Sequence, residues 1–238
     1  MLHIGSRPTV RLRIKTRGNP NQMILDRQQI SLYVAQDNSD SVAVVDTRSN
    51  KVAADIGTAG AEYDVPEIVF RYRGSAPNSL ALSPDGTTLY ITNGGTNSLA
   101  VIRGLPDRAR TIGLIPTGYY PDAVSVSGDG RMLYMVNGKS LSGPNRGYLP
   151  VTNPCHPYVE ALQRSSLLSF PVPDELTLAR LSGVVAENNF FTAQPRPKDQ
   201  LVMAALRKRI KHVIYVIRKI GLTIKYWATS IGETEIRG

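Results

Sequence analysis

Apolar and polar residues alternate along residues 77–103 (PNSLALSPDGTTLYITNGGTNSLAVIR) with the two-residue period of half-buried β-strands. Two turn sequences interrupt this alternation. Residues 83–86 (SPDG) combine a proline, which presets φ, with a glycine, which tolerates positive φ, and residues 93–95 (NGG) form the second turn. The stretch predicts three short antiparallel strands, around residues 80–82, 89–92 and 99–102. Such a meander cannot bury both of its faces alone, so the pattern also predicts neighbouring sheets.

The same pattern recurs on both sides of this stretch. In each copy a proline is followed 13 residues later by a tyrosine inside an apolar run. The three pairs are Pro20 and Tyr33, Pro77 and Tyr90, and Pro121 and Tyr134. The steps between copies are 57 residues (20 to 77) and 44 residues (77 to 121), which places an insertion of about 13 residues around 57–72. A period in the forties made of strands and turns is typical of β-propeller blades.

Three segments resemble the L-Y-V-T-N core of the YVTN-family β-propeller repeat: residues 32–36 (LYVAQ), 89–93 (LYITN) and 133–137 (LYMVN). Residues 39–52 resemble that repeat's S-x-x-V-x-V-I-D-x-x-T-N-K-V segment, and the turn at 83–86 resembles its S-P-D-G turn. The resemblance covers about residues 17–138. It implies a mainly β fold, a partial β-propeller of about three YVTN-type blades of antiparallel strands, with a short helix and a C-terminal strand and tail. The repeats that it implies span about 17–56, 74–115 and 118–138.

Outside these blades, which take up residues 1–138, composition divides the chain further. Residues 139–165 are rich in proline, glycine and serine and predict a long irregular connection. Residues 166–200 predict a bridge, made of a strand at 167–170 and a helix that runs from the N-cap Asp174 to about Asn188, with a linker at 194–197. The helix presents one apolar face, made of Leu178, Leu181 and Val185.

Basic and apolar residues alternate near the start of the chain, with Arg11, Arg13 and Lys15 between Val10, Leu12 and Ile14. This alternation predicts an edge strand with a basic outer face. The same segment contains no apolar core of a secretory signal, so we expect no signal peptide, although the family resemblance suggests a periplasmic or extracellular location. The location in the cell is therefore unknown at this stage. No apolar run approaches 18 residues, so we expect no membrane span.

Residues 210–217 (IKHVIYVI) predict a buried strand and resemble the opening strand of a phosphoesterase domain of the alkaline-phosphatase superfamily. In bacterial fusion proteins of this kind, that domain follows a YVTN propeller. The family continues with K-E-N-R-T-Y-D-Q, which begins its metal and phosphate site, whereas this chain continues with RKIGLTIKYW. The hypothesis is that one base was lost near codon 218, so that residues 201–238 contain a remnant strand and an aberrant, out-of-frame tail. A divergent tail is the alternative.

Motifs for catalysis are absent from the sequence. The chain has a single cysteine, Cys155, and three histidines, and Cys155 stands beside His156 in a loop without a third ligand. Neither G-x-S-x-G nor G-x-G-x-x-G occurs. We therefore expect no catalytic, cofactor-binding or metal-binding residues in this chain, and a divalent metal only if a phosphoesterase domain were present.

The formal net charge of +9 raises the question of a nucleic-acid partner. Residues 207–225 hold seven basic residues and no acidic ones, so much of the excess lies near one end. Aromatic residues do not alternate with the basic ones as a base-stacking platform requires. A solvated basic surface is the simpler interpretation, and we expect no nucleic-acid partner.

Two functions stay open. The first is a non-catalytic β-propeller module, a fragment that acts as a binding or structural platform for an unknown protein or small-molecule ligand, and that can self-associate through open propeller edges. The second is the front part of a metal-dependent phosphoesterase whose catalytic domain is missing. The binding candidates on the loops are Gln36, Asp37, Asn93, Tyr119, Tyr120 and Asn137. The structural alternatives are that the polar residues satisfy turn backbone and that the tyrosines pack between blades.

Overall fold

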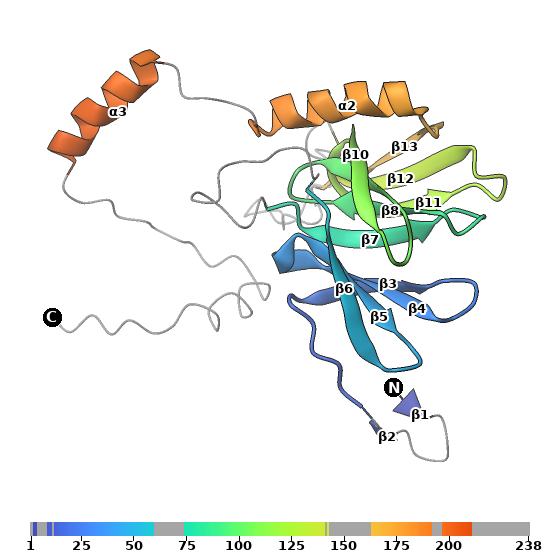
Figure 1. The fold of residues 1–238 in the computed structure, drawn as a ribbon. Coiled ribbons are helices and arrows are strands. Elements are labelled where there is room, and N and C mark those ends of the chain that lie inside the picture. Colours follow the sequence, from blue (N-terminus) through green and yellow to red (C-terminus); the bar gives the residue numbers. More distant parts are fainter. Residues whose placement is uncertain are drawn as a thin grey trace, which may run out of the picture. The chain divides into compact units, whose positions relative to one another are not determined.

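The structure is a computed structural model that describes residues 2–3, 9–10, 12–59, 74–140, 142, 163–191 and 197–210. The chain divides into two units, Met1–Ala193 and Gln194–Gly238. The first unit is mainly β, with three antiparallel sheets of three or four strands (Figure 1), which confirms the predicted fold class. A separate two-stranded ladder is formed by β1 (Leu2–His3) and β2 (Thr9–Val10).

Each of the three sheets contains its strands in sequence order. The first consists of β3 (Pro20–Leu25), β4 (Ser31–Gln36), β5 (Ser41–Asp46) and β6 (Lys51–Gly57), with the 3-10 turn η1 (Asp37–Ser39) between β4 and β5. The second consists of β7 (Pro77–Leu82), β8 (Thr88–Asn93), β9 (Ser98–Arg103) and β10 (Arg110–Pro116). The third consists of β11 (Tyr119–Val126), β12 (Met132–Lys139) and β13 (Ser166–Pro171). The three strands predicted within 77–103 are confirmed.

The register is the same in all three sheets. The repeated proline of the first strand pairs with the glutamine or asparagine that ends the Leu-Tyr motif in the second strand. These Cα partners are Pro20 and Gln36, Pro77 and Asn93, and Pro121 and Asn137. The equal proline-to-tyrosine spacing in the sequence therefore corresponds to equal strand pairing in space.

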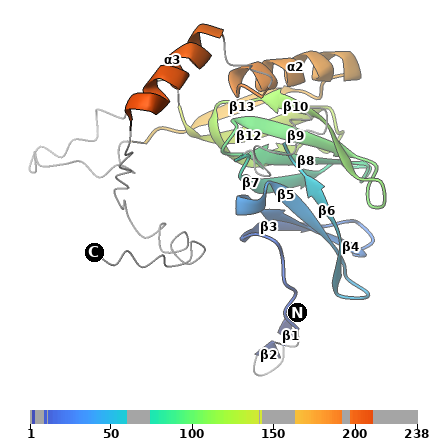
Figure 2. The ribbon, with the colours of Figure 1, turned by 60° about the vertical axis from the view of Figure 1, so that its left-hand side comes forward.

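The first strands of the three sheets lie side by side, and the sheets fan out from them (Figures 1 and 2). The side chain of Gln22 in β3 accepts hydrogen bonds from the Ser79 hydroxyl and the Leu80 amide of β7, both at 2.6 Å. The Ser79 hydroxyl in turn accepts a hydrogen bond from the Val124 amide of β11 at 3.3 Å. Polar contacts thus connect the innermost strands of consecutive sheets.

Apolar side chains fill the space between the sheets. Tyr33 of the first sheet shares a buried cluster with Leu89 and Ile91 of the second. On the opposite face of the second sheet, Tyr90 shares a cluster with Leu133 of the third. The second sheet is therefore buried on both faces, so its strands are not half-buried as their alternation predicts. The predicted need for neighbouring sheets is confirmed.

Side-chain hydrogen bonds stabilise the predicted turns. In the turn at 83–86, the Ser83 hydroxyl and the amide and hydroxyl of Thr87 donate to Asp85. These bonds favour the ionised carboxylate and lower the pKa of Asp85 to about 2. In the first repeat, whose turn reads DRQQ, Asp26 takes over this role and accepts hydrogen bonds from the amides of Ile30 and Ser31 at 2.7 and 3.0 Å.

In the first two sheets, a polar side chain before the third strand holds the segment that leads into the next sheet. Asp40, at φ 52°, accepts hydrogen bonds from the amides of Gly74 at 2.9 Å and Ser75 at 2.7 Å. Asn97, at φ 49°, accepts one from the amide of Tyr120 at 2.8 Å. The left-handed backbone at these positions suits Asp and Asn, whose short side chains tolerate it. This device links the first sheet to the second and the second to the third.

The helix predicted after Asp174 is confirmed as α2 (Glu175–Asn188). The Asp174 carboxylate caps it by accepting a hydrogen bond from the Thr177 amide at 2.7 Å, which lowers the pKa of Asp174. Leu178 and Val185 are buried, and Leu181 is half-buried against the second cluster. The predicted apolar face is therefore the face that packs on the sheets.

Helix α2 covers β10, the outer strand of the second sheet (Figure 1). At Gly113 a Cβ atom would collide with the Leu178 side chain, so the close approach of the helix depends on glycine. The Ser182 hydroxyl accepts a hydrogen bond from the Leu114 amide at 2.8 Å. The helix thereby satisfies an amide of this edge strand and protects the edge from pairing.

Two elements differ from the sequence-based expectations. The strand expected within the bridge is β13, and it pairs with β12 as the third strand of the third sheet. The edge strand predicted around Arg13 and Lys15 is wrong, because residues 12–16 form no strand. Ile14 packs against Val34 on the face of the first sheet, so this segment crosses the face instead of pairing along an edge. Arg11 lies outside the described residues.

The second unit contains the helix α3 (Pro197–Arg209), which the sequence-based interpretation missed. A proline at its first position and the helix-forming residues after it (KDQLVMAALRKR) were the available signals. Ile210 follows the helix without regular structure. The rest of the strand predicted at 210–217, the tail at 218–238, and most of the 57–72 insertion, the 139–165 connection and the 194–197 linker lie outside the described residues. In the described parts of both units, no helix is long and apolar enough to cross a membrane.

Candidate functional site

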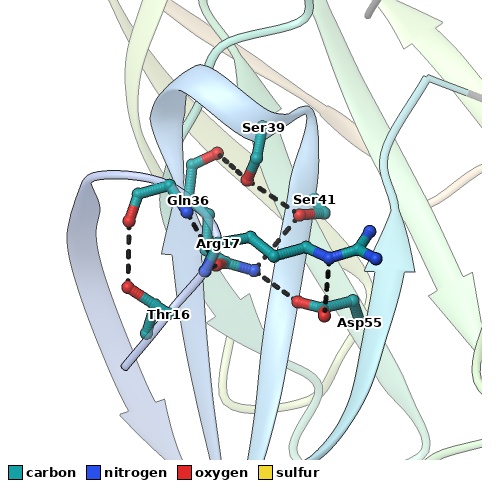
Figure 3. A network of polar contacts seen from close by, with 7 residues as sticks. Thr16, Arg17, Gln36, Ser39, Ser41 and Asp55 are labelled. Carbon is teal, nitrogen blue, oxygen red and sulfur yellow. Dashed lines mark hydrogen bonds and ion pairs between the residues drawn. The ribbon is translucent and has the colours of Figure 1, made fainter. Parts of the chain in front are cut away.

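The three predicted amide candidates at the strand ends are buried. Gln36 is fully buried, and its Oε1 accepts hydrogen bonds from the amides of Arg17 at 2.6 Å and Gly18 at 3.2 Å (Figure 3). Its Nε2 donates to Asp55 Oδ1 at 2.6 Å and to the Ser41 hydroxyl at 3.1 Å. Gln36 therefore ties the segment before β3 to β5 and β6. Its side chain supports the sheet and is not available to a ligand.

Asn93 and Asn137 occupy the equivalent positions of the second and third sheets. Asn93 Nδ2 donates to the Thr58 carbonyl at 3.0 Å, and Asn137 Nδ2 donates to the Ser166 hydroxyl at 3.3 Å. Within the described residues, the two Oδ1 atoms have no hydrogen-bond partner. Both amides are buried and hold neighbouring segments, Asn93 through a backbone carbonyl and Asn137 through a side-chain hydroxyl.

The two tyrosine candidates, in contrast, lie at the surface. Tyr119 is 49% exposed and Tyr120 is 41% exposed. Tyr120 stands in the left-handed region at φ 53°, where its amide is held by Asn97 Oδ1. Its ring lies against the turn at Gly94, where a Cβ atom would come within 3.1 Å of the ring. The ring thus rests against the turn after β8 of the second sheet, while the residue stays partly exposed to solvent.

Charged groups act on the Tyr120 side chain. The Lys139 ammonium lies 5.9 Å from the ring centroid. Burial raises the pKa of Tyr120, and the negative charges of Asp37 and Asp122 raise it further. Burial also raises the pKa of Asp37 and of Asp122, and Lys139 opposes this effect at Asp122. We call Asp37, Tyr119, Tyr120, Asp122 and Lys139 the Tyr120 surface.

Sequence reasoning found three members of the Tyr120 surface and missed Asp122 and Lys139. Asp122 follows the repeated proline, where the other two copies carry Asn21 and Asn78. The replacement of an amide side chain by a carboxylate was the signal that could have identified Asp122. Lys139 pairs with Tyr119 across β11 and β12. That pairing depends on the register of the third sheet, which the sequence did not specify.

A cavity adjoins the Tyr120 surface. It has a volume of ≈ 400 Å³ and lies between the ends of β9 and β10 and the C-terminal end of α2. Its lining includes Tyr119, Asn97, Thr117 and Asn188. Tyr119 therefore contributes to both the exposed surface and the wall of this cavity.

The chemistry of the Tyr120 surface favours binding of cations. Aromatic faces and carboxylates both attract positive charge, and Lys139 already occupies such a position over the ring. Across the described ranges, no group of three or more His, Cys, Asp or Glu side chains could hold a metal ion. An exposed aromatic ring that already attracts an ammonium group suits an organic cation, such as a lysine or arginine side chain.

Comparisons with known proteins describe the fold only. No protein-family profile matches the chain, and no curated protein matches it. Among solved structures, the chain is similar to the hydrazine synthase of Kuenenia stuttgartiensis, with 23% identity and a TM-score of 0.43 over 56% of this chain and 34% of that one.

Two further structures show similar values. A protein of unknown function from Desulfotomaculum acetoxidans is 14% identical, with a TM-score of 0.39 over 50% of this chain and 35% of that one. A candidate 6-phosphogluconolactonase from Bacteroides fragilis is 16% identical, with a TM-score of 0.40 over 49% of this chain and 31% of that one. The chain thus spans about a third of the length of the structures it matches.

Proposed function

We propose that this protein is a non-catalytic binding module of the β-propeller type, and that the Tyr120 surface receives a positively charged group of a protein or small-molecule ligand. The observation that carries the proposal is the 41% exposed Tyr120 side chain, whose amide is held by Asn97 and which feels the negative charges of Asp37 and Asp122. Four of the five residues of this surface belong to the strands β11 and β12, so the sheet holds them in place.

Charge supports a cationic ligand. The whole chain carries a formal net charge of +9, so two carboxylates beside an aromatic ring form a local exception. Lys139, with its ammonium 5.9 Å from the ring centroid, occupies the position that we propose for the cation of the ligand. An incoming arginine or lysine side chain would take the place of Lys139 over the ring and gain the attraction of the same carboxylates.

The binding test compares two substitutions of Tyr120. The probe is a six-residue peptide that carries two arginines, titrated by calorimetry, with a glutamate-containing peptide as the charge control. Tyr120→Leu keeps an apolar side chain but removes the aromatic face, so we expect binding to weaken about two- to fivefold. Tyr120→Phe keeps the face and should bind like the unchanged protein. Equal binding by the leucine variant, or no binding of the arginine peptide by the unchanged protein, contradicts the proposal.

The same titration has an expected pH dependence. Asp37 and Asp122 attract a cation only when ionised, and burial raises the pKa of both above 3.8. Affinity should therefore be full near pH 7 and fall as the pH decreases through these raised pKa values. Asp122→Asn should weaken binding at pH 7 and flatten this dependence, whereas the Asp129→Asn control lies in an exposed turn and should do neither.

The phosphoesterase alternative rests on residues 210–217, of which the structure describes only Ile210. It makes a separate prediction, namely hydrolysis of a phosphomonoester such as p-nitrophenyl phosphate with an added divalent metal. Turnover above background would overturn the proposal that this chain is non-catalytic. Turnover at background would agree with a binding module.

The open face of the third sheet supports the proposal that the protein self-associates. Tyr33 and Tyr90 are buried against the sheets that follow them, whereas the equivalent Tyr134 is 42% exposed and the neighbouring Leu167 is 73% exposed. The three larger sheets in the described part of the chain are also fewer than the four to eight blades of a closed ring. We expect the mass in sedimentation to rise with concentration as second copies cover this face, and Leu167→Glu to prevent the rise. A concentration-independent monomer would contradict this expectation.

A further inference from the structure

A second cavity lies between the turn that joins β9 to β10 and the first turn of α2. Its volume is ≈ 710 Å³, which is within the usual range for small-molecule sites. Three arginines, Arg103, Arg108 and Arg110, line it together with one acidic side chain, Glu175. We call it the arginine cavity.

The arrangement of these arginines is unfavourable without a counterion. Arg103 and Arg110 are Cα partners in the antiparallel pairing of β9 with β10, so their side chains leave the same face of the sheet. Like charges directly opposite each other destabilise a pair of strands. Arg108 adds a third positive charge from the connecting turn, whose amide hydrogen bond to the Gly104 carbonyl at 2.8 Å fixes its position.

Among the described residues that line the cavity, Glu175 is the one carboxylate beside these three cations. Arg103 Nη1 lies 2.9 Å from Glu175 Oε1, but the Glu175 side chain is 84% exposed. Such an exposed ion pair contributes little to stability and is easily exchanged. In the described part of the chain, Arg108 and Arg110 take part in no ion pair.

From this geometry we infer that the arginine cavity binds a phosphate group, either as free phosphate or as the phosphomonoester of a small molecule. Guanidinium groups match phosphate oxygens in paired hydrogen bonds, and a dianion would separate the charges of Arg103 and Arg110. Binding would displace Glu175 from Arg103. Ile112 and Leu178, which also line the cavity, provide an apolar wall for the organic part of an ester.

The test measures binding of inorganic phosphate and of glycerol phosphate by calorimetry at constant ionic strength, with chloride as the background anion. We expect both to bind the unchanged protein, with Arg110→Gln and Arg108→Gln each weakening binding about tenfold or more. Arg131→Gln removes the same charge from an exposed turn of the third sheet and should have no effect. Glu175→Gln should tighten binding, because the anion no longer competes with a carboxylate for Arg103.

The two probes also distinguish the two forms of the ligand. Tighter binding of glycerol phosphate supports an organic ester that uses Ile112 and Leu178, and equal binding supports free phosphate. The inference is overturned if neither probe binds, if the Arg110 and Arg108 variants bind like the Arg131 control, or if Glu175→Gln weakens binding. Circular dichroism spectra that match the unchanged protein establish that each variant is folded.

Discussion

Replacing Leu89 by alanine is expected to lower the free energy of unfolding by about 2–5 kcal/mol. Leu89 is fully buried in β8, in the cluster that joins the first and second sheets. Truncation removes apolar contacts and leaves a cavity that neither sheet can fill, because the polar links between β3 and β7 hold the strands in place. Urea denaturation followed by circular dichroism measures the loss.

The matched control is Leu167→Ala. The same atoms are removed, but Leu167 is 73% exposed on the open face of the third sheet, so we expect a change within about 0.5 kcal/mol. Equal losses at Leu89 and Leu167 would contradict the packing of the first sheet on the second. A loss below about 1 kcal/mol at Leu89 would contradict it as well.

The second large effect is expected at the link between the first two sheets. Asp40 is buried and accepts hydrogen bonds from the amides of Gly74 and Ser75. Asp40→Ala leaves these donors without their acceptor, and we expect a loss of about 1–3 kcal/mol in the free energy of unfolding. Hydrogen exchange at the Gly74 and Ser75 amides should rise at the same time, since they lose protection locally.

Asp40→Asn separates the hydrogen bond from the charge. Asn97 performs the same role between the second and third sheets, at φ 49° against 52° for Asp40, so asparagine fits this backbone. We expect Asp40→Asn to keep most of the stability and of the amide protection. If asparagine is as costly as alanine, the carboxylate acts through its charge, and the link is not the hydrogen-bonded device described above.

The repeat was predictable because its spacing is local. Proline, turn and tyrosine positions recur at equal distances along the chain, and each strand pairs with its sequence neighbour. Helix α2 was predictable for the same reason, because Asp174 caps it and its apolar residues recur at helical spacing. Each predicted element depends on residues that are close together along the chain.

Burial was less predictable, since it depends on neighbours far away in the chain. Tyr33 and Tyr134 share the same motif, yet the first is 2% exposed and the second 42%, because only the first is covered by a following sheet. Gln36 likewise looked like a loop residue, whereas Arg17 and Asp55 enclose its side chain. The partner of β13 could not be inferred, because the 139–165 connection separates it from β12.

The most direct test of the Tyr120 surface as a cation-binding site is the affinity of Lys139→Ala for the arginine peptide. In the unchanged protein, the Lys139 ammonium lies over the ring and competes with the ligand. We predict that Lys139→Ala binds the peptide about two- to fivefold more tightly than the unchanged protein, the opposite of Tyr120→Leu. Weaker binding by Lys139→Ala, or binding that neither substitution changes, would contradict the account.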